Sequence, residues 1–142
     1  MALINKTLKG VVRLTGGEDY NFTLPDNPSG IQNALANIVL EEVFIECDAT
    51  LGSINIYLPQ IALFNGGWIP KIFVTSLVSS EISDITIIPY LDEVNDNSIN
   101  NNVNFSFGGD ILGTAYLHIV SRTNWGAWLT EVIAPPVPPF AP

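Results

Sequence analysis

His118 is the only histidine in the 142 residues and the first candidate for acid–base chemistry. It lies between Leu117 and Ile119 in an alternating segment, so its side chain shares one strand face with Tyr116 and Val120. A catalytic role would pair it with a nucleophilic serine and a carboxylate, and the sequence has no G-x-S-x-G nucleophile turn. A structural or interface histidine is therefore the simpler interpretation.

Cys47 is the single cysteine, which excludes a disulfide framework or a cysteine zinc site within one chain. It falls on the apolar side of its segment with Val43 and Ile45, and no reactive-thiol pattern surrounds it. We expect a small, buried hydrophobic side chain at this position.

Carboxylates gather in the polar segment 92–102, where Asp92, Glu93 and Asp96 have oxygens that could bind Ca²⁺. The EF-hand spacing is absent, because Val94 occupies the third position and no glycine follows at the sixth. A solvated polar turn is the simpler interpretation.

Two further patterns do not match known catalytic or phosphate-binding sites. Glu41 and Glu42 are sequence neighbours whose side chains would point to opposite faces of a strand, which makes them a poor acid/base pair. The paired glycines lack the patterns of phosphate-binding loops and read as turns between strands. The sequence therefore predicts no catalytic residue, no metal site, no cofactor and no enzymatic activity.

Three tryptophans could stack on a sugar ring: Trp68, Trp125 and Trp128. Trp125 and Trp128 have opposite parity along one predicted strand. One of them is therefore expected in the core and the other on the surface. Glycan binding by these rings is kept as an alternative function.

Composition narrows the class of protein. The chain has 14 acidic and 5 basic residues, with a formal net charge of −9, which argues against a nucleic-acid-binding face. Hydrophobic residues make up 47%, which excludes disorder for most of the chain. No run of 18 apolar residues predicts a membrane-spanning helix, and no apolar signal region follows the first charges. Charged residues are only 13%, so we expect a further subunit to cover part of the apolar surface.

Alternating polar and apolar residues predict a series of short strands separated by Gly, Pro, Asn and Asp. These strands cover residues 20–24, 43–48, 53–58, 69–77, 84–88, 103–107, 115–120 and 125–133. About eight or nine such strands predict an all-β fold, an antiparallel β-sandwich or jelly roll. A short helix is expected near residues 31–37.

The chain is expected to have three parts: an N-terminal arm and linker (1–30), a β-sandwich domain (31–133) and a proline-rich extended tail (134–142). Lys6, Lys9 and Arg13 suggest either an arm that docks on an acidic partner or a solvated edge strand. Both interpretations stay open at this point.

The tail, APPVPPFAP, contains five of the ten prolines and should adopt polyproline II. It is either an arm laid on a partner or a loose end, and Val137 and Phe140 would be its apolar anchors.

Aromatic side chains on the outward-facing positions of the strands are costly to leave in water, so they are candidates for a subunit interface. The interface candidates from the strands are Phe44, Tyr57, Phe73, Tyr116 and His118, to which the tail adds Val137 and Phe140. The alternative is that both faces of each strand are core.

The order of these pieces resembles the small β-domains of bacteriophage virion appendages, such as head fibres, capsid decoration proteins and tail-fibre tips. The matching pieces are CDAT (47–50), SINIYLP (53–59), GGW with IPKIFVTSL (69–77), DITIIP (84–89), VNFSF (103–107) and AYLHIVSRTNW (115–125). One departure is the asparagine run 100–102, where the pattern usually has a glycine.

The resemblance implies a non-enzymatic structural protein of the virion, located on the head or tail and assembled as a homotrimer. It also implies that the N-terminal segment attaches to other virion proteins. No individual functional residue is carried over, and the possible external partner is a host surface glycan.

Overall fold

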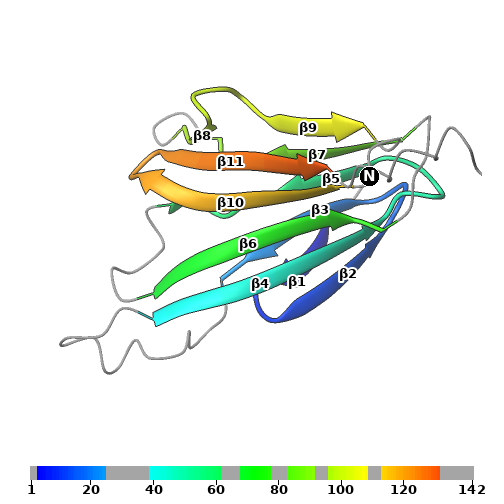
Figure 1. The fold of residues 1–142 in the computed structure, drawn as a ribbon, viewed down its shortest axis with the longest axis horizontal. Coiled ribbons are helices and arrows are strands. Elements are labelled where there is room, and N and C mark those ends of the chain that lie inside the picture. Colours follow the sequence, from blue (N-terminus) through cyan, green and yellow to red (C-terminus); the bar gives the residue numbers. More distant parts are fainter. Residues whose placement is uncertain are drawn as a thin grey trace, which may run out of the picture.

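The chain alternates between two β-sheets (Figure 1). The computed structural model describes residues 3–24, 39–61, 68–77, 83–91, 96–108 and 113–131. The five-stranded sheet contains, in spatial order, β1 (Ile4–Thr7), β3 (Asp19–Thr23), β5 (Ile54–Tyr57), β7 (Asp84–Ile88) and β9 (Phe105–Gly108). The six-stranded sheet contains β2 (Val11–Thr15), β4 (Val39–Asp48), β6 (Trp68–Ser76), β10 (Gly113–Ser121), β11 (Asn124–Glu131) and β8 (Ser98–Ile99).

The first seven strands wind as a two-sheet β-solenoid. Each strand pairs in parallel with the strand two places later, so β1, β3, β5 and β7 build one sheet while β2, β4 and β6 build the other. Parallel strands need a crossover connection. Here the strand of the opposite sheet serves as that crossover.

The last strands reverse this direction. β9 pairs antiparallel with β7, β10 pairs antiparallel with β6, and β11 pairs antiparallel with β10. The prediction of an all-β fold is confirmed for the described residues, but both sheets are mixed, and only these three pairs of described strands are antiparallel. The sequence could not show the direction of pairing. When one face of a strand is buried and the other is solvated, polar and apolar residues alternate along it in the same way in parallel and antiparallel sheets.

One hydrophobic core lies between the two sheets. It takes alternate side chains from both, among them Ile45, Ile72 and Leu117 from one sheet and Ile56 and Ile87 from the other. The remaining side chains of each strand, which alternate with these, therefore point outward. The two outer faces of the molecule follow directly from this alternation.

The N-terminal segment belongs to the two sheets. Residues 3–24 were expected to form an arm and a linker, and the structure places β1, β2 and β3 there, with Leu8, Leu14 and Phe22 in the core. β1 and β2 are edge strands of their sheets. Their basic residues Lys6 and Arg13 therefore lie on edge strands, where lysine and arginine discourage uncontrolled pairing.

Two turns stack where the solenoid changes sheet. The β2–β3 turn lies against the β4–β5 turn, with Gly17 N donating to Ser53 O at 2.8 Å. The β4–β5 turn is closed by Asp48, whose Oδ1 accepts hydrogen bonds from Thr50 N (3.0 Å) and Thr50 Oγ1 (2.6 Å). These hydrogen bonds lower the pKa of Asp48 below its ordinary value.

The asparagine run forms a two-residue turn. Asn100 and Asn101 have positive φ angles of 52° and 63°, and Ile99 and Asn102 exchange backbone hydrogen bonds of 2.9 Å across them. Two successive positive φ angles characterise the type I′ turn, in which asparagine is favoured beside glycine. Asparagine thus takes the conformation that a glycine would supply.

Several expected features lie outside the described residues: the helix near 31–37, the carboxylates Asp92 and Glu93, and the tail 134–142. Asp96, the third carboxylate of that polar segment, is described and exposed. In the described ranges no helix is long and apolar enough to cross a membrane.

Candidate functional site: an aromatic row

Four aromatic side chains form a continuous row across the outer face of the six-stranded sheet. Backbone register places Phe44 beside Phe73, Phe73 beside Tyr116, and Tyr116 beside Trp128, on β4, β6, β10 and β11. Val11 on β2 extends the row beyond Phe44. We call Phe44, Phe73, Tyr116 and Trp128 the aromatic row.

The rings of the row stack on one another. Ring centroids are 5.2 Å apart between Phe44 and Phe73, 5.1 Å between Phe73 and Tyr116, and 6.1 Å between Tyr116 and Trp128. These separations are close to the spacing of neighbouring strands, about 4.8 Å. The rings therefore stand upright on the sheet, with the faces of the inner rings covered by their neighbours and their edges directed outward.

His118 lies beside the row and stacks on its end. Its ring is 4.7 Å from Trp128 with an interplanar angle of 2°, and 5.5 Å from Tyr116 with an angle of 7°. Its Nδ1 is buried and has no hydrogen-bond partner among the described residues. The imidazole acts here as a further flat ring of the stack.

Gly126 makes room for this imidazole. His118 and Gly126 are direct cross-strand partners, and a Cβ at Gly126 would overlap His118 Cε1 and lie 2.9 Å from His118 Nε2 and 2.8 Å from Val120 Cγ2. The missing side chain at Gly126 therefore leaves room for the imidazole, which stacks against Trp128.

Replacement of Gly126 by alanine is expected to push His118 off Trp128. Overpacking of this kind typically lowers the free energy of unfolding by about 1–3 kcal/mol. Since His118 is the only histidine, its imidazole proton resonances report the change directly, and they should lose the shielding that the Trp128 ring gives them. Unchanged imidazole resonances in the variant would contradict this account of the stack.

The ends of the row are open to solvent. Trp128 is 60% exposed, Phe44 39% and Val11 66%. Large apolar side chains in a contiguous, exposed row are uncommon on an isolated soluble chain and mark interaction sites.

The charges around the row are nearly balanced. Among the described side chains of these strands, the basic residues Arg13 and Lys71 project from the same face as the acidic residues Glu42, Glu46 and Asp48. Arg13 Nη2 pairs with Glu46 Oε1 at 3.2 Å, and Lys71 lies in register with Glu42. This face is therefore close to neutral, although the whole chain carries −9.

The outer face of the five-stranded sheet is polar by contrast. Asn55 Nδ2 donates to Asp19 Oδ1 at 2.8 Å, and Asn21 Nδ2 donates to Asn5 Oδ1 at 3.2 Å. Polar side chains of this kind have hydrogen-bond partners within the sheet and can remain exposed to water. Among the described residues, only the outer face of the six-stranded sheet carries a row of aromatic side chains.

The structure divides the predicted interface residues into three groups. Phe44, Phe73, Tyr116 and His118 are brought together on one face. Tyr57 was expected with them but projects from β5 on the other sheet, because alternation fixes a residue's face without fixing which sheet its strand joins. The tail positions lie outside the described residues: Val137 and Phe140.

The tryptophans behave as their parity predicts. Trp125 is fully buried in the core, while Trp128 projects into solvent. The side chain of Trp68 is outside the described set. The glycan-binding alternative is therefore limited to Trp128 among the described tryptophan side chains.

Cys47 is buried in the core as expected, and burial raises the pKa of its thiol from 9.0 to about 12. We expect Cys47→Ser to lower the free energy of unfolding by about 1–3 kcal/mol, because it buries a hydroxyl without a partner. Thiol reagents at pH 8 should label wild-type Cys47 only as fast as the chain unfolds. Rapid labelling of the folded protein, or unchanged melting of the serine variant, would contradict this burial.

The same thiol gives a pH dependence. Between pH 9.0 and about 12 the unfolded chain loses this proton before the folded chain does, so this group's contribution to the free energy of unfolding falls as pH rises through that range.

The described residues contain no group of three or more His, Cys, Asp or Glu side chains placed to hold a metal ion. Sequence reasoning missed Val11 and Gly126 at this face and considered Trp128 only as a glycan contact, because only the strand register places these residues beside the other aromatic residues. Comparison with known proteins finds no matching family model, no similar curated protein and no similar solved structure.

Proposed function

We propose that this chain is a non-enzymatic structural protein of a bacteriophage particle, and that its copies associate through the outer face of the six-stranded sheet. The observation that carries self-association is the aromatic row, Phe44, Phe73, Tyr116 and Trp128, which crosses four strands and has exposed rings, Phe44 and Trp128, at its two ends. The assignment to a virion rests on the resemblance of the strand order to appendage and decoration domains.

Burial of the row would supply the driving force. Aromatic side chains dominate the energetics of interfaces, and a stable interface buries about 800 Å² on each partner. The row lies centrally on the sheet, with the polar pair Thr75–Thr114 (3.0 Å) and the ion pair Arg13–Glu46 on one flank. An apolar centre with a polar border is the usual anatomy of a protein–protein interface.

Charge favours a second copy as the partner at this face. Two chains of −9 repel each other over most of their surfaces. The repulsion is weakest where each chain is close to neutral, and the face around the aromatic row is such a place. The polar outer face of the five-stranded sheet would then remain in water.

The stoichiometry that we propose is a homotrimer, as the resemblance implies, with the N-terminal segment attaching to other virion proteins. Exposed Leu3 and Ile4 at the edge of the five-stranded sheet support a contact there. A trimer requires a head-to-tail contact between unlike patches, whereas a dimer pairs the same patch twice. The mass in solution separates these two outcomes.

Two measurements test the proposal. Light scattering at micromolar concentration should give three times the mass of one chain, and mass spectrometry of purified phage particles should find its peptides. A monomer would overturn self-association, and a dimer would correct the stoichiometry alone. Absence of the peptides from particles would overturn the virion assignment.

Exposure of Trp128 favours a second candidate, a glycan- or receptor-binding module. One side of this indole is stacked on His118, and it is the most exposed ring of the row. Sugar rings stack on exposed indoles of this kind. Binding on a glycan array that Trp128→Ala abolishes, in a protein that stays monomeric, would favour this function over self-assembly.

A further inference from the structure

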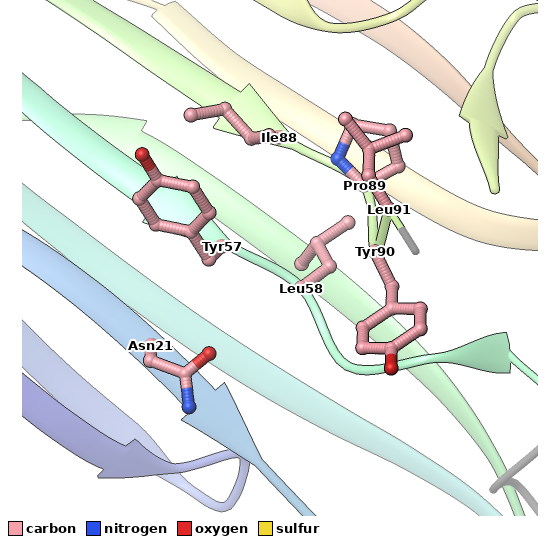
Figure 2. A pocket seen from close by; sticks show the side chains of 7 residues that line it. All are labelled: Asn21, Tyr57, Leu58, Ile88, Pro89, Tyr90 and Leu91. Carbon is pink, nitrogen blue, oxygen red and sulfur yellow. The ribbon is translucent and has the colours of Figure 1, made fainter. Parts of the chain in front are cut away.

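A shallow hollow lies on the outer side of the five-stranded sheet, where β5 and β7 end (Figure 2). Tyr57 and Ile88, the last residues of these strands, share one register row with Asn21 of β3. The residues that follow β5 and β7 complete the lining: Leu58, Pro89, Tyr90 and Leu91. The volume of the hollow is about 160 Å³.

The lining indicates the chemistry of the occupant. All seven residues are uncharged, in a chain with 14 acidic residues, and two of them are tyrosines. Sites for small molecules usually measure about 300–1,000 Å³, so this hollow is suited to one or two side chains rather than to a whole cofactor. Grooves lined by aromatic rings bind proline-rich segments, whose polyproline II conformation needs little ordering.

We propose that the hollow binds the proline-rich segment 134–142 of a neighbouring copy of this chain. That segment, APPVPPFAP, contains no charged residue, so it meets no repulsion from the acidic body and matches an uncharged site. Its prolines would pack against Tyr57 and Tyr90, and Phe140 would follow them. The neighbouring copy as source rests on the self-association proposed above.

Strand direction favours a segment from another copy over the same chain's own segment. Glu131, the last residue of β11, pairs with Gly113 at the start of β10. The neighbouring residue of β10, Thr114, pairs with Thr75 near the end of β6. Glu131 therefore lies near the end of β6. β5 and β7 begin at this same end of the molecule. Leu77, just after β6, donates its N–H to Cys47 O near the end of β4, and β5 follows β4 after a short turn. Asp84 N, at the start of β7, donates to Ser53 Oγ, just before β5.

The hollow lies at the opposite end of the strands, where β5 and β7 finish, as their directions in Figure 1 show. From Asp84 to Ile88, β7 spans roughly 13 Å at 3.3 Å per residue, and a segment that leaves β11 must also pass from the six-stranded sheet to the outer face of the five-stranded sheet. Pro138 and Pro139 reach roughly 22–25 Å beyond Glu131 at 3.1 Å per residue, before any path around the body. A segment from a neighbouring chain does not have to follow this path.

Photo-crosslinking of the full chain tests this docking. We would replace Phe140 with p-benzoylphenylalanine and mix isotopically heavy and light chains before irradiation. The expected product joins position 140 of one isotope to a peptide containing residues 88–91 of the other. The same probe at exposed Leu51, at the opposite end of the strands, is the control and should not label that peptide.

Two further arms make the result specific. Tyr57→Ala should lower the yield of this crosslink about tenfold, whereas Asn55→Ala on the same strand should leave it unchanged. Excess free peptide APPVPPFAP should compete, and a version with alanine for proline should not. Crosslinks only within one chain, or only to other surfaces, would overturn the inference while leaving self-association intact. A monomeric protein would overturn self-association itself.

Discussion

Phe44→Glu should dissociate the assembly while leaving the chain folded. Phe44 is at the exposed end of the aromatic row and stacks on Phe73 at 5.2 Å. Aromatic anchors of interfaces commonly contribute about 3 kcal/mol, which corresponds to more than a hundredfold in Kd, and a buried unpaired carboxylate adds to that loss. Light scattering should therefore show the mass of one chain at concentrations where the wild type is oligomeric.

Phe44→Glu should weaken the association of the chains more than it lowers the free energy of unfolding of each chain. Removal of the Phe44–Phe73 stack should cost the folded chain about 1 kcal/mol, since such ring pairs contribute about 0.5–1.5 kcal/mol. Ser106→Glu is the matched control, because it adds the same charge to an exposed strand position on the other sheet. A Phe44→Glu variant that keeps the oligomeric mass would refute the interface. Dissociation of both variants would attribute the effect to net charge instead.

Gly16→Ala should strongly destabilise the folded chain. A Cβ at Gly16 would overlap Gly52 O and lie 2.6 Å from Gly52 N, and both of these atoms are backbone. No side-chain rotation can relieve that clash, so the β2–β3 and β4–β5 turns would have to separate. The stacking of these turns joins successive strands of the solenoid, and its loss should cost more than about 4 kcal/mol of a total near 5–15 kcal/mol.

Gly10→Ala is the control for Gly16→Ala, because it tests the cost of a positive φ angle without a steric clash. Gly10 has a positive φ of 64°, but a Cβ there would meet no atom within 4 Å. Its replacement should cost only about 1–2 kcal/mol, the usual cost of the left-handed conformation for a residue with a side chain. Urea unfolding measures both variants. A Gly16→Ala protein as stable as Gly10→Ala would mean that the two turns do not approach as closely as described.

The sequence by itself located most of the strands and their buried faces, although it missed β1, β2 and β8. The isoleucines of 84–88, the alternation in 115–120 and the opposite parity of Trp125 and Trp128 all appear in the structure as predicted. Local sequence suffices here because successive side chains on a strand must point to opposite faces, and apolar residues leave water. The burial of Cys47 follows from the same rule.

Only the tertiary structure decided which strands are neighbours and in which direction they run. The alternation of Tyr57 with its neighbours is the same whether its strand joins one sheet or the other, and it is the pairing that separates Tyr57 from Phe44. The aromatic row exists because register aligns positions 44, 73, 116 and 128, which are far apart along the chain. Backbone hydrogen bonds between distant segments set that register, and they depend on the assembled core rather than on any local sequence pattern.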